Sequence, residues 1–390
     1  MEKTCDYSIC TGCGVCSAVC PKKCISFFEG DFGHIYPRIN VADCIDCKKC
    51  ERACPALRDN GLREAVEAYA GIIRDKHDYL TTTSGGAAQA ISKMTLSKGG
   101  VVYGCASLPA AKVCHIRVCR EEDLEKLKGS KYVQSSLLTE FGNIVTDVEA
   151  GRRVLFIGTP CQVAAVKALF NKTPENLLLV DIVCHGVPSL EFLKDYLRHN
   201  GIEPDSVGKI EFRDGQSFKI KVVDKSDKIV YESLSYYEHP LRDIYYTAFI
   251  NGDSYRPSCY GCRFASPSRC SDITIGDFWG LGKVSPADEI PPHDKGISLL
   301  LPVTEKGIRT LDELGRLMAL YRRDVDEAVG GNAQLRHPTP YGAWTGAFNC
   351  LRKIIGVWPA ATIIYYIHRL KDSAVSQILT ITSWITKRRQ

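Results

Sequence analysis

Two stretches near the N-terminus carry cysteines at one shared spacing, C-x2-C-x2-C-x3-C-P. They are CTGCGVCSAVCP at residues 10–21 and CIDCKKCERACP at residues 44–55. This run binds a 4Fe-4S cluster in bacterial-type ferredoxins, where the fourth cysteine ligates the other cluster. The spacing therefore predicts two cubane clusters. The first is ligated by Cys10, Cys13, Cys16 and Cys54, and the second by Cys44, Cys47, Cys50 and Cys20.

Zinc sites and disulfide bonds are the alternatives for so many cysteines. Zinc favours two separated CxxC pairs over this run, and disulfide frameworks belong to small secreted chains. The N-terminal residues MEKTCDYSIC lack the apolar stretch of a secretory signal, so we expect a cytoplasmic protein. Residues 1–60 are predicted to form a complete double-cluster ferredoxin domain. Six further cysteines show no ligand spacing and are interpreted as ordinary thiols: Cys5, Cys24, Cys105, Cys114, Cys119 and Cys350.

A third metal site is indicated by CYGC at residues 259–262, although a lone CxxC also suits a redox dithiol or half of a zinc site. Its missing ligands must come from elsewhere in the chain. Cys161 and Cys184 each follow a predicted buried strand, and Cys270 is the competing ligand. Cys161 and Cys184 could equally be small buried residues, which is common for cysteine.

Strands and helices alternate over residues 66–200, after a short linker at 60–66. Apolar runs predict strands at 68–74, 101–107, 112–119, 152–158 and 176–184, and helices at 87–99, 137–149 and 159–170. This alternation favours an α/β domain with a largely parallel sheet. Ligands of such sheets lie at the carboxyl ends of the strands, and TSGG, GSKYVQS, GTPC and CHG all occupy such positions.

The rest of the chain is predicted to form two further segments. Residues 201–335 contain antiparallel strands and the CxxC pair, and residues 336–390 form an apolar helical segment. Residues 346–390 carry a net charge of +6, whereas the whole chain carries +5. The apolar run 354–367 contains Pro359 and is too short to span a membrane. An interfacial helix in peripheral membrane contact and a helical lid on the chain's own core or on a partner both fit this segment.

Several motifs together resemble the family of coenzyme F420 hydrogenase/dehydrogenase beta subunits, over roughly residues 65–320. They are TSGG (83–86), GSKYVQS (129–135), LFIGTPCQVAAVK (155–167), DIVCHGVPS (181–189), CYGC (259–262) and SDITIGDFWG (271–280). The resemblance implies FAD in an α/β core beside an iron–sulfur cluster, with electrons passing between the flavin and a partner. It also implies a third cluster on Cys161, Cys184, Cys259 and Cys262, and it ranks Cys270 below these four.

The resemblance further implies flavin contacts in these motifs. The candidate cofactor-binding residues are Thr83, Ser84, Gly85, Gly86, Lys131, Tyr132, Ser135, Gly158, Thr159 and Gln162. Backbone N–H groups where a helix begins would meet the FAD pyrophosphate. Lys131 and His185 are the candidate catalytic residues, Lys131 to stabilise a reduced flavin and His185 to move protons. Asp277 is expected to cap a turn.

Two functions follow from these expectations. The first is an iron–sulfur flavoprotein oxidoreductase with a small-molecule or saccharide substrate that the sequence does not identify; the resemblance suggests surface-polysaccharide biosynthesis. The alternative is an electron-transfer subunit that feeds a partner oxidoreductase and has no organic substrate of its own. The double ferredoxin domain favours a low-potential one-electron partner such as ferredoxin. The net positive charge is concentrated in the C-terminal segment, which argues against a nucleic-acid partner.

Overall fold

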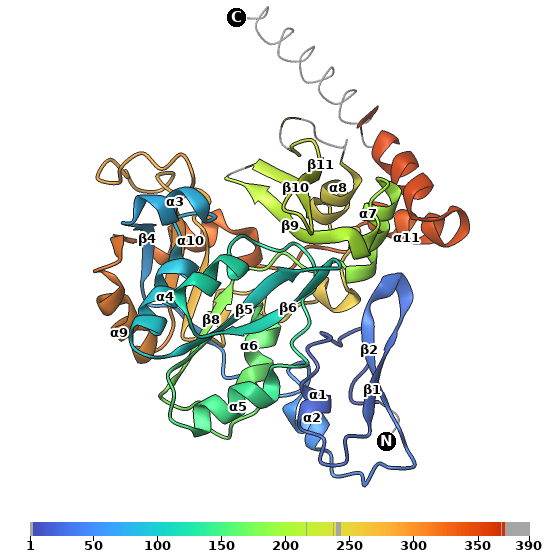
Figure 1. Cartoon of the computed structure of the whole chain (residues 1–390), viewed down its shortest axis with the longest axis horizontal. Coiled ribbons are helices and arrows are strands. Elements are labelled where there is room, and N and C mark those ends of the chain that lie inside the picture. Colours follow the sequence, from blue (N-terminus) through green and yellow to red (C-terminus); the bar gives the residue numbers. More distant parts are fainter. Residues whose placement is uncertain (1–2, 216, 237, 239–242, 368, 371–390) are drawn as a thin grey trace, which may run out of the picture.

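The computed structural model describes residues 3–215, 217–236, 238, 243–367 and 369–370. Figure 1 shows the N-terminal residues, in blue, as a lobe beside a larger α/β body. The lobe contains an antiparallel hairpin of β1 (Ile25–Glu29) and β2 (Ile35–Ile39), with the 3-10 turn η1 (Asp31–Gly33) between the two strands. Two short helices, α1 (Val15–Ala18) and α2 (Lys49–Ala53), pack together. Each helix starts inside one cysteine run, so the repeated sequence gives a repeated structure.

The body is built on an eight-stranded sheet in the order β15-β4-β14-β13-β8-β7-β5-β6. The strands are β4 (Ala68–Ile73), β5 (Val101–Leu108), β6 (Lys112–Val118), β7 (Val154–Gly158), β8 (Leu177–Ile182), β13 (Ile273–Asp277), β14 (Ser298–Pro302) and β15 (Met318–Arg323). Four of them, β13, β8, β7 and β5, are parallel neighbours. The apolar runs of β7 and β14 are buried almost throughout, as strands covered on both faces require.

The α/β class is confirmed, but the sheet is mixed rather than largely parallel. Strands β6, β14, β4 and β15 pair antiparallel around the parallel centre. Parallel neighbours need a crossover connection, usually a helix, whereas β5 and β6 are joined by a short turn. No helix of the described residues separates β13 from β14, so the chain returns antiparallel there.

Helices and short turns complete the body. The helices are α3 (Lys76–Thr81), α4 (Ala87–Ser97), α5 (Phe141–Glu149), α6 (Pro160–Lys167), α7 (Leu190–His199), α9 (Glu305–Leu314) and α10 (Val325–Gly331). The 3-10 turns are η2 (Glu121–Leu127), η3 (Pro204–Ser206), η4 (Pro257–Cys259) and η5 (Ala333–Leu335). A two-residue ladder of β3 (Arg63–Glu64) and β12 (Ser268–Arg269) joins the residues after the ferredoxin lobe to those after the CxxC pair.

A second sheet packs against the end of the first, with strand order β11-β10-β9 (Figure 1). Its strands are β9 (Val207–Asp214), β10 (Ser217–Asp224) and β11 (Ile229–Glu232), and they are antiparallel as expected. Helices α8 (Ile244–Ile250) and α11 (Ala343–Ile355) share its core. That core is aromatic: Tyr245, Tyr246 and Phe249 of α8 are all buried.

The start of the C-terminal segment packs on the chain's own core. Residues 357–367 are helical, and Ala360, Ala361, Ile364 and Tyr365 are buried in the core of the second sheet. Ile363 and Tyr366 on the same helix are exposed. The described part therefore forms a lid, one of the two expected alternatives, and residues 371–390 lie outside the described residues. In the described part of the chain, no helix has the length and hydropathy to cross a membrane.

Candidate iron–sulfur centres

The first thiol group is the four predicted ligands of the first cluster: Cys10, Cys13, Cys16 and Cys54. Cys10, Cys16 and Cys54 are buried. Burial raises the pKa of Cys16, and the thiols of Cys13, Cys10 and Cys54 add to that rise. Burial likewise raises the pKa of Cys13 to about 11, with Cys54 and Cys10 contributing. The fold therefore brings these cysteines close enough to act on one another.

The second thiol group is the four predicted ligands of the second cluster: Cys20, Cys44, Cys47 and Cys50. All four line one pocket of the lobe. Cys50 is buried and the other three are partly exposed. Lys22, Lys48 and Lys49 also line this pocket, so the second site opens toward a basic part of the surface.

The third thiol group comprises Cys161, Cys184, Cys259 and Cys262. Cys161 lies in the first turn of α6, directly after β7, and Cys184 follows the neighbouring strand β8. Burial raises the pKa of Cys184 to about 12, with further contributions from Cys259 and Cys262. Burial also raises the pKa of Cys161, and Cys262 and Cys184 add to the rise. Cysteines far apart in sequence thus meet at the carboxyl edge of the sheet.

Cys270 packs in the same buried cluster as Cys161 and Cys262 of the third group, but it has its own polar neighbours. Its Sγ is 3.5 Å from the carbonyl oxygen of Pro160, to which it donates a hydrogen bond. Burial raises the pKa of Cys270 to about 12, and the charged neighbours that act on it are Asp181, Arg269 and Lys167 rather than the four thiols. The arrangement favours a structural role for this competing candidate.

The donor sets fit cubane clusters better than single ions. Among the described residues, no group of three or more His, Cys, Asp or Glu side chains is arranged to hold a metal ion. A cubane has one iron for each of its four thiolates, so its ligands need not converge on one point.

Two of the cysteines that we interpreted as ordinary thiols lie close to the predicted ligands, and both are buried. The Sγ atoms of Cys24 and Cys20 are 3.4 Å apart, and Cys24 lines the pocket of the second group. Cys5 packs in one cluster of buried residues with Cys10 and Cys54 of the first group. Neither cysteine belongs to a ligand run, so only proximity in the fold reveals it.

The three thiol groups lie in series. Cys16 of the first group packs in one cluster of buried residues with Cys50, Cys20 and Cys44 of the second. Cys13 packs in another with Cys161 and Cys262 of the third. The first group therefore stands between the exposed second group and the third group in the body.

Hydrogen bonds join several predicted flavin contacts beside the third group. The Nε2 atom of Gln162 donates to the carbonyl oxygen of Ser135 (3.1 Å) and to its Oγ (3.0 Å). The backbone N–H and the hydroxyl of Thr159 both donate to Gln162 Oε1. Thr159 Oγ1 also lies 3.3 Å from Cys161 Sγ.

The sequence motifs did not indicate His115, which also contacts this set. Its Nδ1 atom lies 3.3 Å from Ser135 Oγ, and burial lowers the pKa of His115 to about 4. The fold thus brings Ser135, Gly158, Thr159 and Gln162 together.

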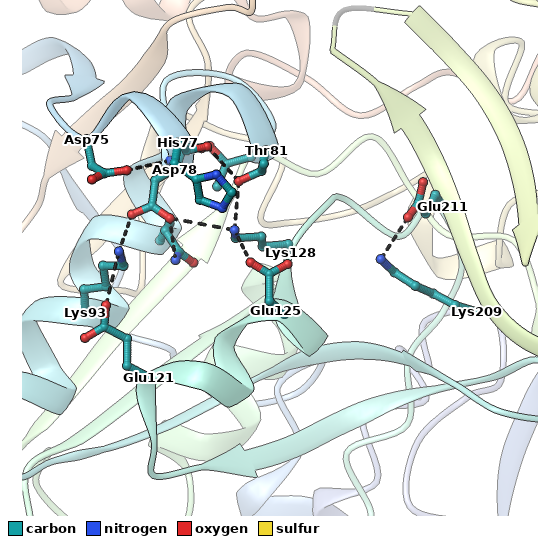
Figure 2. Close-up of polar contacts among 12 residues, drawn as sticks. Asp75, His77, Asp78, Thr81, Lys93, Glu121, Glu125, Lys128, Lys209 and Glu211 are labelled. Carbon is teal, nitrogen blue, oxygen red and sulfur yellow. Dashed lines mark hydrogen bonds and ion pairs between the residues drawn. The ribbon is translucent and has the colours of Figure 1, made fainter. Parts of the chain in front are cut away.

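Lys131 differs from the two lysines near it. Figure 2 shows Lys128 bound to Glu125 and Asp78, and Lys209 bound to Glu211. Lys131 instead donates to two carbonyl oxygens at the end of η2, those of Leu127 (2.8 Å) and Lys128 (2.9 Å). It makes no ion pair among the described residues, and burial lowers its pKa to about 8.

Two parts of the chain match known protein families. Residues 9–57 match a 4Fe-4S dicluster domain, and residues 151–326 match the C-terminal domain of the coenzyme F420 hydrogenase/dehydrogenase beta subunit. The chain therefore joins a 4Fe-4S dicluster domain to a region that is similar to this beta subunit. The resemblance is confirmed, and the chain is an iron–sulfur protein with a region similar to an oxidoreductase subunit.

Individual relatives are distant. One subunit of the F420H2 dehydrogenase of Methanosarcina mazei is 21% identical over 225 residues, which are 54% of this chain and 63% of that protein. The chain thus spans less than two thirds of that relative's length. An uncharacterized protein of Methanocaldococcus jannaschii is 23% identical over 317 residues, 71% of this chain and 82% of that protein. Among solved structures, a chain of the F420-reducing [NiFe] hydrogenase complex of Methanosarcina barkeri is similar to this chain, with a TM-score of 0.45 and 20% identity. The match covers 68% of this chain and 84% of the hydrogenase chain.

The remaining predicted residues of the beta-subunit-type part are spread along the sheet edge. Tyr132 packs its ring against the aromatic core of the second sheet, including Phe249. The ring of His185 lies 6.1 Å from that of Phe249, and burial lowers the pKa of His185. Asp277 ends β13 and pairs with Arg213 at 2.7 Å. Their roles toward a flavin stay predictions.

The TSGG motif at residues 83–86 packs against the main sheet. Ser84 Oγ donates to the carbonyl oxygen of Ile297 (2.7 Å), and the N–H of Gly85 donates to Ser298 Oγ (3.0 Å). Gly86 precedes α4 with φ 80°, and Thr83 is partly exposed on the same turn. A Cβ on Gly85 would come within 1.9 Å of the carbonyl oxygen of Gly71. The motif therefore closes the turn onto β4 and β14 whether or not it also contacts a flavin.

We expect Gly85→Ala to lower the stability of the chain by about 1–3 kcal/mol, the usual cost of overpacking a filled core. Gly142→Ala is the matched control, because Gly142 lies within α5 and a Cβ there meets no atom within 4 Å. Alanine should stabilise this helix by roughly 0.5–1 kcal/mol. Thermal unfolding of the purified protein at one fixed heating rate measures both changes. Equal midpoints for the two variants would contradict the close packing at Gly85.

Proposed function

We propose that the chain is an electron-transfer subunit, which exchanges single electrons with a carrier at the second cluster and with a partner oxidoreductase at the third. The observation that carries this proposal is the serial order of the thiol groups, with Cys16 and Cys13 as the packed links. Each cluster holds one transferable electron, so a row of them acts as a wire. The name of the M. mazei relative, which is one component of a dehydrogenase, supports a subunit role.

The surface around the second cluster suits an acidic carrier of the ferredoxin type. Five basic residues are exposed there: Lys22, Lys23, Lys48, Lys49 and Arg52. Fewer acidic residues share this end of the lobe: Asp43, Asp46 and Glu51. Exposed apolar side chains, Val41 (55%) and Ile45 (58%), lie in the same segment. A basic rim around a partly exposed redox centre attracts an acidic protein and brings it close enough for transfer.

We expect the double variant Lys48→Glu/Lys49→Glu to slow reduction of the chain by a reduced, acidic two-cluster ferredoxin by about tenfold at low ionic strength. The difference should shrink as salt is added, because salt screens exposed charges. Anaerobic stopped-flow absorbance, at two salt concentrations, measures the rate. Lys76→Glu is the matched control, since Lys76 is exposed on α3, far from the lobe in Figure 1. Equal slowing by both variants would contradict docking at the second cluster.

A flavin-dependent oxidoreductase is the second candidate, and Lys131 favours it. A partly buried cation without an ion pair among the described residues suits the anion of a reduced flavin, beside the bonded set of Ser135, Thr159 and Gln162. A bound FAD would convert between two-electron and one-electron transfer. The expected role in surface-polysaccharide biosynthesis stays a prediction, which neither the fold nor the names of the relatives support.

One purification separates the two candidates. Iron, sulfide and flavin are measured per chain after anaerobic purification, and reduced F420 is added as a probe substrate. About twelve irons without flavin, and no oxidation of reduced F420 by the chain alone, would support the electron-transfer role. About one FAD per chain with oxidation of F420 would overturn it in favour of the flavoenzyme. About eight irons would remove the third cluster from both proposals.

A further inference from the structure

Arg256 is a fully buried cation whose hydrogen bonds to oxygen all go to neutral groups. Its Nε atom donates to the carbonyl oxygen of Cys10 (2.5 Å), Nη1 to Oε1 of Gln134 (3.1 Å) and Nη2 to the carbonyl oxygen of Ile35 (2.8 Å). The guanidinium lies 4.3 Å from the ring centroid of Tyr36. Within the described residues, Arg256 forms no ion pair with a carboxylate, so dipoles and a ring solvate its charge.

The chain contains a contrasting case. Arg269 is as deeply buried as Arg256, but its Nη2 atom lies 3.0 Å from a carboxylate oxygen of Asp181. Such pairing is the rule, because an isolated charge in the protein interior costs several kcal/mol. Arg256 therefore needs an anion that is not a carboxylate.

The first thiol group provides that anion. The Nη2 atom of Arg256 lies 3.7 Å from Cys10 Sγ. Arg256 is also three residues before Cys259, and its charge acts on the thiols of both Cys10 and Cys259. A Cβ at Gly12 would come within 2.6 Å of Nη1, and Gly12 has φ +66°. The first cysteine loop thus folds over the guanidinium, and only glycine leaves room for it.

We propose that Arg256 is the counter-cation of the first cluster and raises its reduction potential. A cubane with four thiolates is a net anion. Reduction adds one electron, breaks and forms no bond, and increases the negative charge. A buried cation beside the cluster therefore stabilises the reduced form more than the oxidised form. This inference rests on the dicluster domain carrying its clusters and is independent of which partner or flavin the protein uses.

The test is a redox titration of the full chain under anaerobic conditions, with dithionite as electron source and electron paramagnetic resonance as readout. In Arg256→Gln, the equilibrium constant for reducing one cluster should fall at least about tenfold, which is about 59 mV for a one-electron couple. The other clusters should keep their potentials. Arg256→Lys retains the charge and should recover most of the shift, although it loses the planar fork.

A second variant leaves Arg256 in place. Gln134→Glu puts a carboxylate next to Nη1, where Oε1 of Gln134 accepts at 3.1 Å, and so neutralises the cation. It should lower the potential of the same cluster as Arg256→Gln does. If Arg256→Gln loses iron, its potentials cannot be compared with those of the wild type, and the potential measured in Gln134→Glu alone decides the test. A full iron content with unchanged potentials in Gln134→Glu would overturn the proposal and leave Arg256 as a joint between lobe and body. The rate of reduction by ferredoxin tests the proposed function separately, so the two can fail independently.

Discussion

Replacing Cys161 with serine should remove one whole cluster, about four of about twelve irons per chain. Cys161 belongs to the third thiol group, and it packs in one buried cluster with Cys262 of that group and Cys13 of the first. Serine is similar in size, so the fold of the α6 start should survive, while the loss of one thiolate leaves the third cluster with three. Iron and sulfide per chain, measured after anaerobic purification, give the result. The two clusters of the dicluster domain should remain visible by electron paramagnetic resonance after reduction.

Cys270→Ser is the matched control for this prediction. Cys270 packs in the same buried cluster as Cys161 and Cys262, but its Sγ donates to the carbonyl oxygen of Pro160, and the charged groups that act on its pKa are Asp181, Arg269 and Lys167. Its replacement should leave the iron content unchanged. Loss of four irons in Cys270→Ser, with full iron in Cys161→Ser, would exchange the two residues in the ligand set. Full iron in both variants would mean that the third group binds no cluster.

The sequence predicts those parts of the site that depend on short-range spacing or on strand ends. Each ferredoxin run brings three cysteines together within seven residues, so the spacing alone indicates the ligands. Cys161 and Cys184 were expected near each other because parallel strands end at the same sheet edge, and β7 and β8 are parallel neighbours. The CxxC pair reaches that edge through the loop before β13. That the CxxC pair joins Cys161 and Cys184 in one site was inferred from the resemblance and not from spacing.

What the sequence does not reveal depends on contacts between lobe and body. Arg256 stands in no motif, and only the folded chain shows that it reaches Cys10, 246 residues earlier. Cys5 and Cys24 have no ligand spacing and become neighbours of the clusters through the hairpin of the lobe. The antiparallel half of the main sheet was missed because a buried strand has the same apolar run in either direction.

Asp181→Asn should destabilise the chain by about 3–5 kcal/mol, because it leaves Arg269 as an uncompensated buried charge. Asp181 and Arg269 are 0% and 2% exposed, and the two side chains are 3.0 Å apart. The loss is a large part of the roughly 5–15 kcal/mol that holds a typical domain folded. The midpoint of thermal unfolding should fall by roughly 10 °C, at about 2–4 °C per kcal/mol. Samples with full iron content, heated at one fixed rate, give the comparison.

The double variant Asp181→Asn/Arg269→Met should recover most of this loss. Burial raises the pKa of Asp181 in spite of the opposite effect of Arg269. The loss of hydration therefore destabilises the ionised carboxylate more than the nearby guanidinium stabilises it. Such a pair contributes little net stability, and removing both charges is often neutral or stabilising. The remaining cost comes from the hydrogen bonds that Arg269 donates to Thr274 Oγ1 (3.1 Å) and to the carbonyl oxygen of Phe264 (2.7 Å). A double variant less stable than Asp181→Asn would show that these hydrogen bonds, which fix the loop after the CxxC pair, outweigh the unpaired charge. Arg269 would then act mainly as a support for the third thiol group.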